Sequence, residues 1–326
     1  MSELTLVEAL TTALARAMEH NERVLVLGED VGVNGGVFRA TNGLHDRFGP
    51  ERVLDMPLSE SMFTGLAVGL AAQGFRPVVE YQFMGFLYPA LEQLANHASR
   101  LRTRTRGRLT CPMVVRAPYG GGVRAPEHHS ESFEAMLAHI PGLRVVVPSS
   151  PRRAYGLLLA AIADPDPVVF LEPKRIYRMT SETLEDNGDA LPLDTCFTLR
   201  RGSDLTILTW GASTVEALGA ADELAAEGTS AEVIDVATLK PLDMATILES
   251  VERTGRCIIV HEAPRAGGLG AEIAAGLADA GLTSLLAPVE RVTGWDTVIP
   301  LFRRELDYFP DRTRVLAAAH RVLEFT

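Results

Sequence analysis

The chain has 326 residues, which is enough for about two domains that each bury a full hydrophobic core. Its formal net charge of -11 argues against a broad basic surface for nucleic acid or for an anionic membrane. Its three cysteines lie far apart with no Cys-x-x-Cys pair, which argues against a disulfide framework or a zinc site and favours a reducing, cytoplasmic location.

The first residues of the chain predict an amphipathic helix. Thr5 and Glu8 have the spacing of a capping box, in which each side chain bonds the backbone of the other residue at a helix start. Such a start is unlike a secretory signal peptide, and no apolar run approaches the ~18 residues that a membrane span needs. We therefore expect no membrane partner.

Short β-branched runs alternate with helical patterns along the chain. This alternation predicts parallel sheets covered by helices on both faces, which is a three-layer α/β fold. The first series of predicted strands covers 24–27, 53–55, 78–81, 113–117, 145–147 and 168–171. The second series covers 205–210, 231–236, 257–261 and 289–293. Residues 179–201 between them are polar and acidic without periodicity, so we predict an exposed connection there and two domains, 1–190 and 191–326.

Glu60 is the first candidate catalytic residue. It closes the segment 56–60, which joins a predicted strand to a small-residue apolar helix at 61–74. An acid at this place either complements the helix dipole or serves a ligand. Phe86 and His129 follow later predicted strands. Because open α/β sheets bind ligands at the carboxyl ends of their strands, the three residues form a candidate set of carboxylate, aromatic platform and histidine.

Other motifs give weaker signals. Residues 26–32 carry two acids where a dinucleotide-binding turn would hold a pyrophosphate, and no Walker, H-E-x-x-H or G-x-S-x-G motif occurs. The glycines at 35–36 and 120–122 indicate turns, close packing or flexible backbone. His128 and His129 are adjacent, so we expect their side chains to point in different directions, which disfavours a shared metal. Either one is a loop residue or a proton donor.

Residues 100–108 hold the only concentration of basic side chains. Cations near the end of a helix complement its dipole, and arginines are frequent at subunit contacts. We interpret the segment as a helix end or a subunit contact, with a docking site for an acidic partner as the alternative.

Six segments in a fixed order carry a family resemblance: Gly28-Glu29-Asp30-Val31, Gly35-Gly36-Val37-Phe38, Pro57-Leu58-Ser59-Glu60, Gly120-Gly121-Gly122-Val123, His129-Ser130 and Asp166-Pro167-Val168-Val169-Phe170-Leu171-Glu172-Pro173. Together they resemble the beta subunit of the decarboxylating component of 2-oxo acid dehydrogenase complexes, in the transketolase-like thiamine diphosphate superfamily. The resemblance covers essentially the whole chain. It implies a transketolase-like pyrimidine-binding domain followed by a transketolase C-terminal domain.

The resemblance implies a cofactor-binding role for five residues. Glu60 would hydrogen-bond the pyrimidine ring nitrogen of thiamine diphosphate, which makes it a catalytic residue that acts through the cofactor. Phe86 would stack on the aminopyrimidine, with Leu58 and Gln82 beside it. Glu29 would couple paired active sites.

The resemblance also implies the partners. His129 would be the second catalytic residue, donating a proton as the dithiolane of a lipoyl arm opens. The chain has no Gly-Asp-Gly motif for the cofactor's diphosphate and Mg²⁺. An alpha subunit would therefore hold both in an α2β2 heterotetramer, and the second domain would offer surface for the lipoyl acyltransferase core.

A structural potassium ion is a further implication of the resemblance. Its ligands would be the backbone carbonyls of Met113, Ala161, Asp164 and Asp166, since oxygen ligands suit a hard cation. Pro165 lies inside this loop where many relatives carry a different residue, which alters the expected loop geometry.

The substrate is left open between two classes of 2-oxo acid. Residues 171–178 resemble branched-chain-type subunits, whereas residues 32–41 resemble pyruvate-type ones equally well. Branched-chain 2-oxo acids are slightly preferred, and pyruvate is the first alternative. Acetoin cleavage by a homologous complex comes next. A non-catalytic scaffold subunit, in which Glu60 and His129 are structural, and a nucleotide-binding module complete the alternatives.

Overall fold

Seven strands form the larger sheet, in the order β12-β6-β7-β5-β4-β2-β3. The computed structural model describes residues 1–326, apart from the side chain of Glu127. The strands of the first half in this sheet are β2 (Val24–Gly28), β3 (Val53–Asp55), β4 (Arg76–Glu80), β5 (Val114–Tyr119), β6 (Arg144–Val146) and β7 (Val168–Pro173). Their pairings with one another are parallel. The predicted parallel sheet is confirmed.

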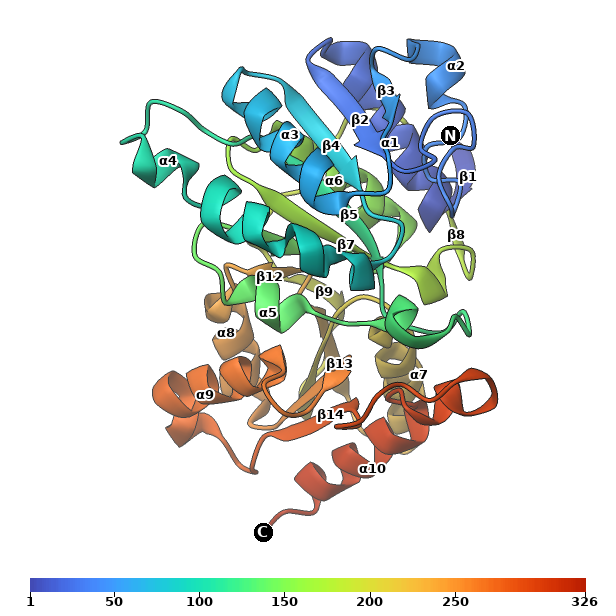
Figure 1. The fold of residues 1–326 in the computed structure, drawn as a ribbon. Coiled ribbons are helices and arrows are strands. Elements are labelled where there is room, and N and C mark those ends of the chain that lie inside the picture. Colours follow the sequence, from blue (N-terminus) through green and yellow to red (C-terminus); the bar gives the residue numbers. More distant parts are fainter.

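Helices cover both faces of this sheet (Figure 1). On one face α1 (Leu6–His20) and α6 (Pro151–Ala163) enclose one hydrophobic core, and on the other α3 (Glu60–Ala72) packs on a second. The predicted capping box starts α1, where the Thr5 N–H donates to the Glu8 carboxylate at 2.8 Å. The short helices of this half are α2 (Leu44–Phe48), η1 (Met84–Ala90), η2 (Gln93–Ala98), α4 (Leu101–Arg104), η3 (Glu127–Ser130), α5 (Glu134–Ala138) and η4 (Lys174–Ile176).

The second half forms a five-stranded sheet in the order β14-β13-β10-β11-β9. Its strands are β9 (Phe197–Arg200), β10 (Leu205–Thr209), β11 (Ala231–Asp235), β13 (Cys257–Pro264) and β14 (Glu290–Gly294). Its helices are α7 (Ser213–Ala226), α8 (Met244–Thr254), α9 (Leu269–Gly281), η5 (Leu282–Ser284), η6 (Phe302–Asp307) and α10 (Arg312–Leu323). The apolar sides of α7 and α10 share one core, and α8 and α9 pack on the other face. The second three-layer α/β unit is confirmed.

Four strands were not predicted, and two of them lie in the segment that we expected to be an irregular connection. β8 (Ser181–Leu184) pairs antiparallel with β1 (Ser2–Thr5), and β9 pairs antiparallel with β11. The expectation of an irregular stretch over 179–201 is wrong for these strands. Each of them needs a backbone partner on one side only, so its sequence carries no continuous apolar run.

The two halves share an apolar contact. β12 (Thr238–Lys240), which follows the second half's β11 in the chain, pairs antiparallel with β6 at the edge of the larger sheet. One continuous core cluster contains side chains of α3 from the first half and of α8 and α9 from the second. Figure 1 shows α5 and β12 between the upper and lower halves. We keep residue 190 as the proposed domain boundary.

The basic residues 100–108 lie partly on a helix end. Arg102 and Arg104 are in the last turn of α4, which projects from the first half in Figure 1. The Arg102 guanidinium pairs with the Asp166 carboxylate at 2.7 Å. The helix-end interpretation is confirmed for these two residues, and a subunit contact stays a prediction. Among the described residues, none of the helices combines the length and apolar character that a membrane crossing requires.

Glu134 is buried at the contact between the two halves. It begins α5, and its Oε1 accepts a hydrogen bond from Trp210 Nε1 of the second half at 3.2 Å. Burial raises its pKa from the ordinary 4.5 to about 7, and the nearby Glu262 acts in the same direction. The folded chain therefore holds a proton that the unfolded chain releases.

We expect this burial to make the chain less stable as pH rises from about 4.5 to about 7, with no further loss from this group above that range. Glu134→Gln stays neutral and keeps an acceptor for Trp210. The wild type should lose stability over this range and the variant should not, so the free energy of unfolding of the variant minus that of the wild type should rise by about 2 kcal/mol from pH 5 to pH 8. Urea unfolding at the two pH values measures this rise. Glu249→Gln, on the exposed side of α8, is the control, and an equal pH dependence in all three proteins would contradict the assignment.

Candidate active site

The predicted site residues lie at the carboxyl edge of the larger sheet. Glu29 follows β2, and Leu58 and Glu60 follow β3. Gln82 and Phe86 follow β4, and the segment that ends with His129 follows β5. Parallel strands present their carboxyl ends at one edge, so chain segments far apart in sequence meet there.

Glu60 is the first residue of α3 and is buried. Thr64, one turn later, donates its hydroxyl to the Glu60 carbonyl at 2.6 Å and shares a 2.7 Å hydrogen bond with the Tyr81 hydroxyl. Burial and the Glu60 charge both raise the pKa of Tyr81, so this phenol stays protonated. A carboxylate at a helix start is stabilised by the dipole, and these bonds fix the helix that carries it.

A cavity of about 420 Å³ opens beside Glu60. Its walls are Glu60, Gly85, Phe86, Tyr88, Pro89 and His128. Leu58, two residues before Glu60, is 80% exposed. The site is therefore a mostly apolar recess with a carboxylate in its wall and an exposed apolar residue in the adjoining loop.

Glu29 supplies a second buried carboxyl group. Burial is the largest cause that raises the pKa of Glu29, and the charges of Glu60 and Asp30 raise it further. Among the described residues, its buried Oε1 has no hydrogen-bond partner. A buried polar atom without a partner is costly, which makes Glu29 a group that a ligand or a partner chain could satisfy.

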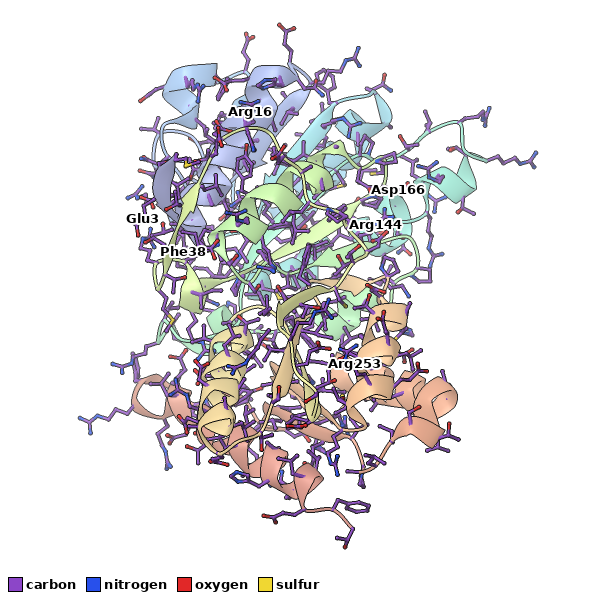
Figure 2. All side chains as sticks on the ribbon, turned by 180° about the vertical axis from the view of Figure 1, so that it is seen from behind. Glu3, Arg16, Phe38, Arg144, Asp166 and Arg253 are labelled. Atoms are coloured by element: carbon purple, nitrogen blue, oxygen red, sulfur yellow. The ribbon has the colours of Figure 1, made fainter. Side chains whose placement is uncertain are left out.

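An aromatic cluster surrounds His129. Phe86, the predicted platform, lies 5.3 Å from the His129 ring centre, and Phe83 lies closer at 4.4 Å. Phe83 also contacts Phe38 at 5.4 Å and Phe86 at 5.8 Å (Figure 2 labels Phe38). Phe83 was not predicted, although an aromatic residue three positions before Phe86 in the loop after β4 is a signal that could have found it.

His129 has a defined tautomer. Its Nδ1 lies 2.8 Å from the carbonyl oxygen of Pro126. Because a carbonyl oxygen only accepts, Nδ1 carries the hydrogen and Nε2 is the ring nitrogen that can exchange a proton. His128 also reaches this region: its ring lies 5.0 Å from His129 and 5.2 Å from Phe86. The expectation that the two histidines point in different directions is wrong, because both pack against the same phenylalanine.

Comparison with known proteins identifies the fold family. The family described as transketolase, pyrimidine binding domain, matches residues 2–180, and transketolase, C-terminal domain, matches residues 195–314. The pyruvate dehydrogenase E1 component subunit beta of Bacillus subtilis (strain 168) is 48% identical over 325 residues and covers 100% of both chains. The chain belongs to the transketolase-like E1 beta subunits of 2-oxo acid dehydrogenases.

Further relatives of this E1 beta subunit agree with the assignment. The pyruvate dehydrogenase E1 component subunits beta of Staphylococcus epidermidis (strain ATCC 12228 / FDA PCI 1200) and Staphylococcus aureus (strain N315) are 44% and 43% identical, each over 100% of both chains. A solved structure described as a split gene transketolase, inactive beta4 tetramer, matches with a TM-score of 0.81 and 25% identity, covering 99% of each chain.

Beneath the site of this E1 beta subunit, Arg116 of β5 is fully buried between two carboxylates. Its Nη1 donates to Glu80 at 2.7 Å, and its Nε donates to Glu172 at 2.6 Å. Tyr177 donates its hydroxyl to Glu172 at 2.5 Å. These bonds tie β4, β5 and β7 together at the site edge. This network was not predicted, although an arginine inside the apolar run 113–117 is a signal for it.

The predicted potassium loop of the E1 beta subunit lies at the opposite, amino edge of the sheet, before β5 and β7. Arg76 Nη1 donates to the Asp164 carbonyl at 3.0 Å and to the Ile162 carbonyl at 2.7 Å. The Met113 carbonyl accepts from the Val168 N–H at 3.0 Å. A permanent cation therefore already lies at this loop, and potassium binding stays a prediction.

Side-chain ion pairs hold the same loop from outside. Asp164 pairs with Arg144 at 2.9 Å, and Asp166 pairs with Arg102. Figure 2 shows Arg144 and Asp166 in one region of the first half. The carboxylates are thus engaged by arginines, and the Ala161 carbonyl accepts from the Asp164 N–H at 3.3 Å.

Proposed function

We propose that this chain is the catalytic beta subunit of a pyruvate-type 2-oxo acid dehydrogenase and that it acts only with an alpha subunit in an α2β2 heterotetramer. The observation that carries the proposal is the buried Glu60 at the start of α3, in the wall of a cavity that also contains Phe86. The reaction would be oxidative decarboxylation of the 2-oxo acid, followed by transfer of the acyl group to the lipoyl group of an acyltransferase core.

The residues present fit the aminopyrimidine part of thiamine diphosphate. The cavity has a carboxylate and an aromatic side chain in its wall, and nearby Glu29 has a buried oxygen without a partner among the described residues. A flat heteroaromatic group with N–H donors matches such a recess. We propose that Phe86, Leu58 and Gln82 border this group. Gln82 is oriented through a 3.1 Å hydrogen bond to Asp30.

Thiamine diphosphate, when bound, supplies the thiazolium nucleophile that decarboxylation of a 2-oxo acid requires. Glu60 would hydrogen-bond the pyrimidine ring nitrogen and place the negative charge of its carboxylate beside that nitrogen. The cluster of Phe83 and Phe86 would exclude water from the same region. With Nδ1 bonded to the Pro126 carbonyl, His129 would take up a second proton at Nε2 and donate it to the sulfur that leaves as a lipoyl disulfide opens.

Two observations support the proposal that this chain forms only half of the cofactor site, which we call the half-site proposal. The chain lacks the Gly-Asp-Gly motif for the diphosphate and Mg²⁺, and the cavity beside Glu60 is bordered by exposed side chains, including Tyr88 at 50% exposure. An alpha subunit would hold Mg²⁺ and the diphosphate and close the open side. The acyltransferase core would dock on the second domain.

We expect the isolated chain to bind thiamine diphosphate with Mg²⁺ weakly or not at all, and we expect co-expression with its alpha subunit to restore tight binding. Titration calorimetry on the chain alone and on the purified pair measures the difference. The pair carrying Glu60→Ala is the matched control and should lose binding. Tight, magnesium-dependent binding by the isolated chain would contradict the half-site proposal.

The same purified pair tests the substrate. The three bacterial E1 beta relatives described above are named as pyruvate dehydrogenase subunits and give no support to the slight preference for branched-chain substrates. We therefore expect a higher kcat/KM for pyruvate than for 2-oxoisovalerate with an artificial electron acceptor. The reverse order would restore the branched-chain class, turnover of acetoin alone would place the chain in that homologous complex, and no turnover at all would favour a scaffold subunit.

A further inference from the structure

The segment Gly120–Ser130, which carries His129, is held by a residue of the second half of the chain. Glu305, in η6, is 1% exposed. Its Oε1 accepts from the Gly122 N–H at 3.0 Å and its Oε2 accepts from the Arg124 N–H at 2.8 Å. Ser130 Oγ donates to Oε1 at the longer distance of 3.4 Å. We infer that Glu305 is a positioning residue for His129.

Only a carboxylate fits this arrangement. Gly122 and Arg124 both have a left-handed backbone, with φ of 93° and 56°, which turns two nearby N–H groups toward one side chain. Each N–H receives its own oxygen of the Glu305 carboxylate, and hydrogen bonds to an ionised acceptor are among the stronger ones. A glutamine has one acceptor oxygen and would turn its NH₂ toward the other N–H group.

The three consecutive glycines explain how the segment approaches so closely. Lys174 donates to the Gly120 carbonyl, and Phe309 lies so near Gly121 that a Cβ at that position would collide with its ring. Gly122 is the residue that Glu305 binds. Each glycine of the run is therefore held by a different buried side chain, and two of these side chains come from the second half of the chain. The glycine run is a docking surface for the second half and not a phosphate loop.

This anchoring determines where the His129 ring lies. His129 is five residues after Arg124, and its Nδ1 hydrogen bonds to Pro126 within the same segment. Gly85 lies directly against the His128 carbonyl, so a shift of the segment toward Gly85 is blocked. With Glu305 in place, the His129 ring is held against both Phe83 and Phe86. Without it, the segment loses both of its backbone anchors to η6.

Glu305→Gln in the assembled enzyme tests the inference by hydrogen exchange, which needs no turnover. We expect exchange at Gly122 and Arg124 to rise about tenfold or more, the scale set by losing one charge-assisted hydrogen bond, with the sheets of both halves unchanged. Asp307→Asn, an exposed acid of the same short helix, is the matched control and should leave the segment unchanged. Unchanged exchange in Glu305→Gln would overturn the anchoring.

Activity then tests the positioning, and this part rests on the proposed function. We expect Glu305→Gln to keep artificial-acceptor turnover within about threefold and to lower kcat for acyl transfer to the lipoyl group by about 10-fold to 100-fold, the cost of misplacing a catalytic group. Equal loss in both assays, with exchange raised throughout the chain, would make Glu305 merely structural. If Glu305→Gln does not fold, Glu305→Asp keeps two acceptors on a shorter side chain and should show the same local rise in exchange. A wild type without 2-oxo acid activity would reject the proposed function and leave the exchange result to decide the anchoring.

Discussion

Glu60→Gln in the assembled enzyme is expected to slow turnover by roughly 100-fold or more, the scale of acid-base catalysis, while the fold remains intact. The amide has nearly the shape of the carboxylate, so Thr64 can still donate to the backbone carbonyl of residue 60 and the start of α3 is kept. What the amide lacks is the negative charge. An uncharged side chain beside the pyrimidine ring nitrogen cannot stabilise the protonation state that the cofactor's pyrimidine needs.

Proton–deuteron exchange at the thiazolium carbon of the bound cofactor measures this effect directly. We expect the exchange rate to fall together with kcat, whereas the free energy of unfolding should change little. Glu272→Gln, which also replaces an acid in the first turn of a helix, is the matched control for the helix dipole and should leave exchange unchanged. An unchanged exchange rate in Glu60→Gln would return Glu60 to the role of a helix-start acid.

Glu29 explains why the charge on Glu60 matters beyond its own hydrogen bond. Burial is the largest cause of the raised pKa of Glu29, and the charge of Glu60 raises it further, so the two carboxyl groups favour a state with fewer charges. A donor from a bound ligand near Glu60, or a partner chain near the open oxygen of Glu29, would relieve this repulsion. We therefore expect ligand binding and protonation to be linked at this pair, and we expect the neutral amide of Glu60→Gln to remove the contribution of Glu60 to that link.

Much of the fold was predictable because most strands are buried on both faces. Strands such as 24–28 and 168–173 are nearly continuous apolar runs, since helices cover both sides of each sheet. β1 and β8 form a separate pair, and β9 and β12 lie at sheet edges, so their sequences do not need such runs. Backbone pairing determined these strands, and sequence patterns carry little information about it.

The site could be predicted only where local sequence signals exist. Glu60 stands at a visible strand-to-helix junction, and Phe86 follows an apolar strand, so both could be assigned to the same sheet edge. The contact between Gly122 and Glu305 joins residues 183 positions apart, and only the docking of the second half on the first creates it. The close approach of His128 to Phe86 likewise depends on how the segment after β5 is held.

His129→Ala separates the two half-reactions. We expect the variant to retain most of the turnover measured with an artificial electron acceptor, which withdraws electrons without lipoyl chemistry. Overall activity with the acyltransferase core should fall by about 100-fold, the range for loss of a general acid. The structural reason is that Nδ1 is committed to the Pro126 carbonyl, so Nε2 is the ring nitrogen that can take up a proton and then deliver it to the opening disulfide.

The choice of control for this variant follows from the geometry around Phe86. His128 lines the cavity beside Glu60 and contacts Phe86, so His128→Ala is expected to disturb both assays and cannot serve as a silent control. His20 is exposed at the end of α1, so His20→Ala is the control variant and should leave both assays unchanged. Equal damage to both assays by His129→Ala would place that histidine in substrate binding or decarboxylation. Full activity in both assays would show that neither reaction needs the proton or the ring volume of His129, and would leave it as a packing residue of the aromatic cluster.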